Sequence, residues 1–150
     1  GKLIAQVALP ESCAHGTYFA PRAFEIPSLA TLTREVFGPV LHVVRYAARD
    51  LDAVIDAINA TGYGLTLGIH SRIDSTVARI QGRVRAGNIY VNRNQIGAVV
   101  GVQPFGGEGL SGTGPKAGGP HYLARFATER TLTINTTAAG GNASLLTLGT

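Results

Sequence analysis

The order of hydrophobic patterns between residues 40 and 92 constrains the fold more than any other feature of this sequence. A run rich in β-branched residues is followed by a helical stripe of apolar positions, and both patterns then repeat. The order is strand, helix, strand, helix, strand, over residues 40–46, 51–60, 65–69, 75–86 and 88–92. Short joints between strands that alternate with helices favour right-handed crossovers. The sequence therefore predicts an α/β fold with a mainly parallel sheet and flanking helices.

Short polar residues mark the ends of the two predicted helices. Asp50, Asp52 and Asp74 are interpreted as helix caps, because a short carboxylate accepts hydrogen bonds from the free N–H groups of a first turn. Thr61 and Gly62 are expected to end the first helix.

The regions outside this central unit are less regular. Short strands are expected at residues 3–7, 17–21 and 130–136, and short helices at residues 28–35 and 120–126. The tail is too apolar for a solvated chain end. We expect Leu145, Leu146 and Leu148 to pack against another surface, such as a second subunit.

The composition excludes several classes of protein. With 150 residues, 45% of them hydrophobic, the chain has enough apolar material for a folded core without metal or disulfide. No apolar run approaches the roughly 18 residues of a membrane span, and no basic and then apolar leader opens the chain. We therefore expect neither a membrane span nor a secretion signal. The absence of methionine, together with a start that reads like mid-protein sequence, is expected of a piece of a longer protein.

The net charge of +4 does not by itself indicate a nucleic-acid partner. The arginines are scattered, and the tightest group, Arg79, Arg83 and Arg85, has no interleaved aromatic residues and belongs to no recognisable nucleic-acid module. A solvated helix face is the favoured interpretation. The single Cys13 excludes an internal disulfide and fits a reducing cytoplasm.

Glycine is in excess, with 20 residues, and the excess is concentrated in residues 95–120. A loop of this length inside a domain is usually functional. Residues 107–112 match G-x-G-x-x-G, but they neither follow a strand nor open a helix, so we reject a Rossmann fingerprint. Two interpretations stay open: backbone N–H groups that converge on an anion, or close-packed turns that need positive φ angles.

Few side chains carry obvious chemistry. Cys13 and His15 have a Cys-x-His spacing, but further ligands or a catalytic context are missing, so a packed thiol in a loop is favoured and no metal site is predicted. His42 and His70 are interpreted as structural. Glu35 stands at the end of the predicted helix 28–35, where a carboxylate is unfavourable to the helix dipole. This placement suggests that Glu35 has another role.

Four motifs give the sequence a resemblance to the aldehyde dehydrogenase superfamily, in matching order and spacing over about residues 17–126. They are EVFGPV at 35–40, YGLTLG at 63–68, RAGNIYVN at 85–92 and PFGGEGLSG at 104–112. Residues 92–101 and 118–122 give a narrower resemblance to L-glutamate γ-semialdehyde dehydrogenases, also called Δ1-pyrroline-5-carboxylate dehydrogenases. Residues 135–144 resemble the tail of the bifunctional bacterial proline utilisation A proteins.

The resemblance implies an activity and a set of site residues. Enzymes of this family oxidise L-glutamate γ-semialdehyde to L-glutamate with NAD, as part of proline catabolism. Glu35 would bind the hydroxyls of the nicotinamide ribose, and Phe37 would pack beside the nicotinamide. Gly97 and Ala98 would offer backbone N–H groups to the substrate α-carboxylate, and Phe105 would line the substrate tunnel.

The resemblance also implies what the chain lacks. The family's nucleophilic cysteine and general-base glutamate precede the motif that contains Glu35, so no catalytic residue is expected in this chain and Cys13 is not the nucleophile. Residues 1–128 would be the carboxyl-terminal part of the catalytic domain, and residues 129–150 a strand and tail that join a homo-oligomer. FAD would be bound only by a proline dehydrogenase domain elsewhere in the protein. The chain alone is expected to be inactive, and its parent enzyme to be cytoplasmic.

The sequence leaves two other hypotheses about the function open. One is a folded, oligomerising module without catalysis, and the other is an aldehyde dehydrogenase for another semialdehyde.

Overall fold

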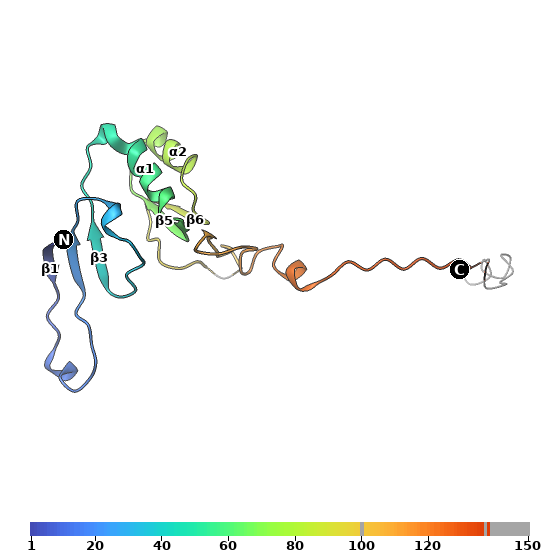
Figure 1. Cartoon of the computed structure of the whole chain (residues 1–150), viewed down its shortest axis with the longest axis horizontal. Helices are drawn as coiled ribbons and strands as arrows, with labels where there is room; N and C mark the ends of the chain where they lie inside the picture. The colour runs from blue at the N-terminus through green and yellow to red at the C-terminus, as the bar shows by residue number, and fades with distance from the viewer. Residues whose placement is uncertain (100, 137, 139–150) are drawn as a thin grey trace.

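The computed structural model describes residues 1–99, 101–136 and 138. Its strands are β1 (Lys2–Gln6), β2 (Arg22–Glu25), β3 (Val40–Val43), β4 (Tyr63–Gly64), β5 (Thr66–Ile69), β6 (Asn88–Val91) and β7 (Glu108–Gly109). Its helices are α1 (Leu51–Ala60) and α2 (Asp74–Gln81), with short 3-10 turns η1 (Glu11–Cys13), η2 (Leu29–Thr31), η3 (Ala48–Asp50) and η4 (Leu123–Phe126). Figure 1 shows β1 and β3 at one end of the molecule, the two helices beside β5 and β6, and an extended segment that leads to the C-terminus.

The N-terminal sheet has the strand order β1-β2-β3. Strand β1 runs antiparallel to β2, whereas β2 runs parallel to β3 with Arg22 opposite Val40. The strand expected at residues 17–21 is wrong, because the strand begins only at Arg22. Pro21 directly precedes it and has no N–H group to donate to a neighbouring strand. The strand predicted at residues 40–46 is confirmed, although it ends at Val43.

Helix α1 has the predicted register and end. Ile55, on the predicted apolar stripe, is 1% exposed, and Gly62 adopts a φ of 76° just beyond the helix. Asp50 occupies the predicted N-cap position of α1, but its side chain makes no cap hydrogen bond. Its φ and ψ of −95° and 10° continue the preceding 3-10 turn, whereas a capping residue takes an extended conformation.

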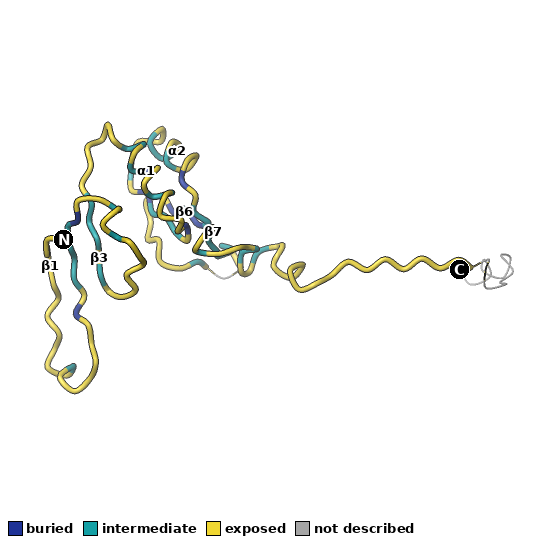
Figure 2. Tube along the Cα trace, in the orientation of Figure 1, coloured by how far each residue is buried: buried dark blue, intermediate teal, exposed yellow. Residues whose placement is uncertain are grey.

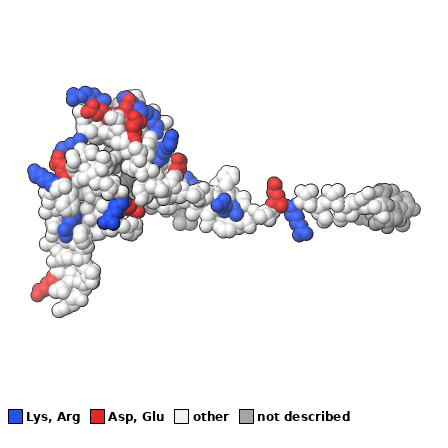
Figure 3. Space-filling view, viewed as in Figure 1, with Lys and Arg blue, Asp and Glu red and all other residues white. Residues whose placement is uncertain are grey.

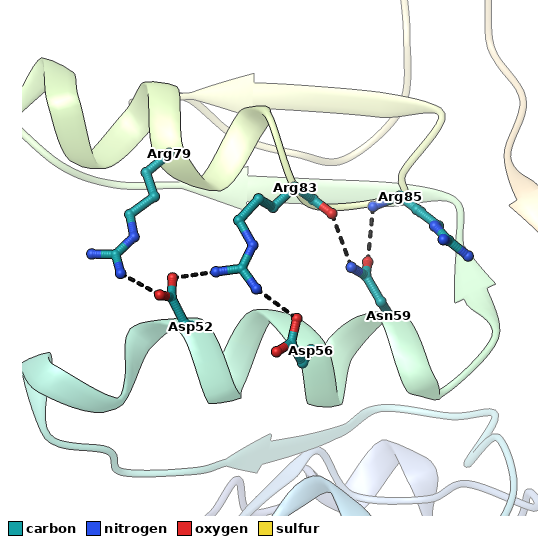
Figure 4. A network of polar contacts seen from close by, with 6 residues as sticks. All are labelled: Asp52, Asp56, Asn59, Arg79, Arg83 and Arg85. Atoms are coloured by element: carbon teal, nitrogen blue, oxygen red, sulfur yellow. Dashed lines mark hydrogen bonds and ion pairs between the residues drawn. The ribbon is translucent and has the colours of Figure 1, made fainter.

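The other two aspartates predicted as caps do not occupy N-cap positions. Asp74 is the first residue of α2, after the N-cap Ile73. Asp52, in the first turn of α1, contacts both Arg79 and Arg83 of α2 (Figure 4). The hydrogen bond from Arg79, followed by the positive charges of both arginines, holds the pKa of Asp52 below its ordinary value of 3.8. The helices are therefore joined through their charged faces.

Further polar contacts extend this junction between the helices. Nη2 of Arg83 lies 2.7 Å from Oδ1 of Asp56. The side chain of Asn59 donates to the carbonyl of Arg83 and accepts from the N–H of Arg85, at 2.9 Å each. Basic and acidic side chains alternate over this end of the molecule (Figure 3), which agrees with the predicted solvated helix face.

Helix α2 connects β5 to β6, which pair in parallel with Thr66 opposite Asn88 and Ile69 opposite Val91. The second strand–helix–strand unit is therefore confirmed, although α2 ends at Gln81 rather than near residue 86. The predicted single sheet is not formed within the described residues. β3 belongs to the N-terminal sheet, and β4 pairs with β7 from the glycine-rich loop. Hydrophobic periodicity predicts the faces of a strand but not the partner at its edge.

The core is small and centred on α1, β5 and β6. Among the described residues, the buried apolar side chains are Ala20, Ile26, Ile55, Ile69, Val84 and Tyr90. Asn88 is the buried polar residue in the same part of the chain, at 8% exposure. Figure 2 shows most of the N-terminal hairpin and the C-terminal segment as exposed.

The helix expected at residues 28–35 is wrong, because only the turn η2 forms there. Leu32 leaves it with φ and ψ of −92° and 92°, and the β-branched Thr31 and Thr33 beside it disfavour a helix. Glu35 therefore does not lie at a helix end, and the helix dipole gives it no special role. The helix expected at residues 120–126 is confirmed only as the turn η4.

The C-terminal segment is extended and exposed. Leu132 and Ile134 are 78% and 69% exposed, and no strand is assigned within residues 129–136. Within the described residues, this segment pairs with none of the assigned strands. Leu145, Leu146 and Leu148 lie outside the described residues. Neither helix in the described part of the chain has the length and apolar character of a membrane-spanning segment.

Candidate functional site

The glycine-rich loop of residues 95–120 rests on the ends of β4 and β6. Its two sides join at Phe105 and Ala117, which exchange backbone hydrogen bonds of 3.0 and 2.8 Å. The side-chain Oγ of Ser111 accepts a 3.0 Å hydrogen bond from the N–H of Gly64 in β4. The described part of the loop is thus held to the fold at Phe105, Ala117 and Ser111.

Residues 107–112 form a close-packed part of the loop. A Cβ atom on Gly107 would lie 2.7 Å from the Cβ of Ser111 and 2.9 Å from the carbonyl of Gly64. Gly109 also has a φ of 58°, which favours glycine. For this stretch the packing interpretation is confirmed, and the match to G-x-G-x-x-G reflects tight turns rather than a phosphate cradle.

The turn at Gly97 and Ala98 is open instead. Gly97 has a φ of 68°, and a Cβ atom placed on it would meet nothing within 4 Å. Within the described residues, no protein acceptor binds the N–H groups of Gly97 or Ala98. Free N–H groups on a glycine turn can receive an anion without a basic side chain.

Two buried polar residues hold this loop, and the sequence reasoning missed both. The Tyr90 hydroxyl donates to the carbonyl of Gly97 at 3.2 Å, and Nδ2 of Asn88 donates to the carbonyl of Pro104 at 3.1 Å. Both residues lie on the buried face of β6. The signal in the sequence was the polar Asn88 at a position where a buried strand face predicts an apolar residue.

Phe105 is half-buried, between two loop residues that both contact Asn88. Pro104 accepts from the Asn88 amide, and the N–H of Gly106 donates to Asn88 Oδ1 at 3.3 Å. The structure therefore ties the segments of Gly97 and Phe105 to one face of β6.

Glu35 and Phe37 lie in a different part of the surface. Glu35 lines a hollow of about 250 Å³ together with Thr66, Arg85 and Ser111. Phe37 is 95% exposed, and its ring faces solvent. An exposed carboxylate beside hydroxyl groups and a free aromatic face are suited to a polar, planar ligand, but the structure shows no contact between this pair and the turn at Gly97.

Cys13 is distant from these features in the fold. It lies half-buried in η1, within the connection between β1 and β2, and is a free thiol. The expectation of a packed loop thiol agrees with this place. Within the described residues, no group of three or more His, Cys, Asp or Glu side chains could hold a metal ion. His42 lies in β3 as expected, whereas His70 directly follows β5.

Comparison with known proteins gives these features a context. Residues 2–132 match the aldehyde dehydrogenase family. The bifunctional protein PutA of Rhizobium meliloti is 59% identical over 128 residues, covering 85% of this chain and 10% of the relative. The 1-pyrroline-5-carboxylate dehydrogenase of Geobacillus kaustophilus is 39% identical over 121 residues, covering 79% of this chain and 23% of the relative.

A solved structure gives the same result in three dimensions. A crystal structure of a variant of Bradyrhizobium japonicum proline utilization A (PutA) matches with a TM-score of 0.82 and 65% identity, covering 93% of this chain and 14% of that chain. The chain spans about a tenth of the length of the PutA relative from Rhizobium meliloti.

Proposed function

Because this chain belongs to the aldehyde dehydrogenase family, we propose that it forms part of an NAD-dependent enzyme that oxidises L-glutamate γ-semialdehyde to L-glutamate. The observation that carries the proposal is the open turn at Gly97 and Ala98, whose N–H groups are unused within the described residues. The substrate differs from simple aldehydes by its α-carboxylate, and this turn is suited to bind that group. The names of the relatives, PutA and 1-pyrroline-5-carboxylate dehydrogenase, support the same substrate.

In this proposal the site residues divide into two sets. Gly97 and Ala98 bind the α-carboxylate through their N–H groups, and Phe105 presses on the aliphatic part of the substrate. Glu35 accepts hydrogen bonds from the hydroxyls of the nicotinamide ribose, because a carboxylate offers two acceptor oxygens, and Phe37 packs beside the nicotinamide. NAD, when bound, accepts the hydride that the oxidation releases.

The two sets belong to one site only when other protein segments complete it. We propose that a nucleophilic cysteine and a general-base glutamate come from segments outside this chain, and that Cys13 takes no part in the chemistry. Residues 1–128 then form the carboxyl-terminal part of the catalytic domain, and the chain alone has no turnover.

A second proposed role concerns residues 129–150, as a strand and tail that pair with another copy of the protein. The observation that favours it is the exposure of Leu132 and Ile134, which alternate with polar residues in an extended segment to which no strand is assigned. Such a segment can pair with a sheet edge on another subunit.

A chimaera tests the proposed function. The matching segment of Rhizobium meliloti PutA would be replaced by this chain. NADH formation from glutamate semialdehyde would be followed by the ultraviolet absorbance of NADH, for the chimaera and for the chain alone. We expect the chimaera to retain turnover and the chain alone to show none. A folded chimaera that oxidises other aldehydes but not glutamate semialdehyde would refute the proposed substrate.

A further inference from the structure

Strand β6 carries two polar side chains into the interior beneath the loop. Asn88 and Tyr90 are 8% and 6% exposed, and they share one face of the strand because side chains alternate along it. Neither residue has a role in the proposed function so far. A buried polar residue costs stability unless its hydrogen bonds are made, so the partners of both residues carry information.

The contact of Tyr90 fixes the direction of one peptide group. Its hydroxyl donates to the carbonyl of Gly97 at 3.2 Å. This carbonyl and the N–H of Ala98 belong to the same peptide group, which is planar and has its C=O and N–H pointing in opposite directions when trans. Holding the Gly97 carbonyl toward β6 therefore turns the Ala98 N–H away from β6. That N–H is the one assigned above to the substrate carboxylate.

Asn88 connects Tyr90 to the other substrate-facing segment. Its Nδ2 lies 3.4 Å from the Tyr90 hydroxyl and 3.1 Å from the carbonyl of Pro104. Its Oδ1 accepts from the N–H of Gly106 and from Nζ of Lys116, both at 3.3 Å. The Lys116 ammonium also binds the carbonyl of Gly87. One network of polar contacts thus runs from the Gly97 carbonyl to both neighbours of Phe105.

We propose that Tyr90 is a positioning residue for substrate specificity: it orients the Ala98 N–H toward the α-carboxylate, and Asn88 keeps the Tyr90 hydroxyl and the Phe105 segment in register. The inference rests on the proposed function, because it names how the carboxylate is selected. It predicts that the network matters for aldehydes that carry the carboxylate and not for those that lack it.

The test uses Tyr90→Phe in the full-length enzyme that contains this chain. The variant keeps the buried ring and removes only the hydroxyl. Since one hydrogen bond is lost, we expect the KM for glutamate semialdehyde to rise about two- to tenfold. The kcat and the KM for NAD should stay near the wild-type values. With butanal, which has no carboxylate, kcat/KM should be unchanged.

Asn88→Asp is the second variant, which tests the same network from its other end. It keeps an acceptor for Gly106 and Lys116 but removes the donor to Pro104, and its carboxylate competes with the Gly97 carbonyl for the Tyr90 hydrogen. We expect the same selective rise in the KM for the semialdehyde. Tyr18→Phe is the matched control, because Tyr18 is 62% exposed in the connection between β1 and β2 and should behave like the wild type.

The outcomes separate this inference from the proposed function. A wild-type enzyme that does not oxidise glutamate semialdehyde overturns the proposed function. A wild-type enzyme that does, with an unchanged semialdehyde KM in both variants, overturns the positioning role. An equal loss of activity toward the semialdehyde and butanal also overturns it, because a general packing defect would have that signature.

Discussion

Replacing Gly87 by alanine is expected to displace the part of the loop that carries Phe105. A Cβ atom on Gly87 would lie 1.8 Å from the carbonyl oxygen of Gly106 and 2.9 Å from the Cα of Gly107. Both contacts are to backbone, so no side-chain rotation can relieve them. The loop must retreat by more than about 1 Å, and overpacking of this kind typically costs about 1–3 kcal/mol.

The same displacement reaches the substrate-facing segment. Gly106 donates to Asn88 Oδ1 at 3.3 Å, and a shift of this size takes the pair beyond hydrogen-bond distance. We therefore expect Gly87→Ala to lower the urea midpoint of unfolding and to raise the KM for glutamate semialdehyde together. Urea denaturation followed by far-ultraviolet circular dichroism, and steady-state kinetics on the full-length enzyme, measure the two effects.

Gly82→Ala is the matched control for this prediction. Gly82 ends α2 in a right-handed helical conformation, with φ of −73°, and an added Cβ atom would meet the carbonyl of Ala78 at 3.2 Å. The same added methyl group should therefore change the free energy of unfolding by less than about 1 kcal/mol in either direction. The reasoning fails if Gly87→Ala is as stable as Gly82→Ala and has the wild-type KM.

Three further substitutions test the other assignments. Ala98→Asp places a negative charge beside the substrate carboxylate, and at about 4 Å this repulsion costs about 1–4 kcal/mol between the dielectric limits of water and a protein surface. The semialdehyde KM should therefore rise steeply, whereas the neutral Ala98→Asn should raise it much less. Equal KM values for the two variants would contradict the carboxylate anchor. Glu35→Gln should raise the KM for NAD about tenfold through the loss of a charge-assisted hydrogen bond, and the semialdehyde KM should be unchanged. An unaltered KM for NAD would contradict the assignment of Glu35 to the cofactor site. Because the Arg79 hydrogen bond lowers the pKa of Asp52 below 3.8, its stabilising effect is fully present above that pH and is lost as the pH falls through the lower, folded-state pKa. The stability difference between the wild type and Asp52→Asn should thus shrink in acid, and a difference that is the same at pH ~3 and pH ~7 would contradict this ion pair.

The local elements of the fold could be predicted because their signals are local. The apolar stripe that contains Ile55 predicted α1, and the β-branched run at residues 40–46 predicted β3. The pairing of strands was not predictable in the same way. β4 is only two residues long, and its partner Glu108–Gly109 lies more than 40 residues further along the chain. No periodicity in a single sequence indicates such a pair, so one continuous sheet was expected where separate sheets form.

The candidate site shows the same division between local and distant signals. Glycine composition predicted an irregular loop, but not which glycines are packed and which are open, because that depends on atoms such as the Gly64 carbonyl beside Gly107. The motif that contains Glu35 was found through its resemblance, although the reasoning from a helix end was wrong. Asn88 lies inside the motif at residues 85–92, but its role was not predictable, since its partners in the loop, Pro104, Gly106 and Lys116, lie 16 to 28 residues away.

The reason for a polar pair on a buried strand face lies in the loop above it. In a turn that would bind a carboxylate through its N–H groups, glycine lets the ligand approach the backbone closely because it has no Cβ atom. The same lack of a side chain leaves the backbone of the turn flexible. Stiffness must then come from outside the turn. Strand β6 supplies it, since its backbone is fixed by the parallel ladder with β5 and its side chains Asn88 and Tyr90 reach the loop carbonyls. Two apolar side chains at these positions would pack into the same interior without the cost of burying polar atoms. The stability of β6 therefore does not explain the pair, whereas the proposed role in orienting the loop does.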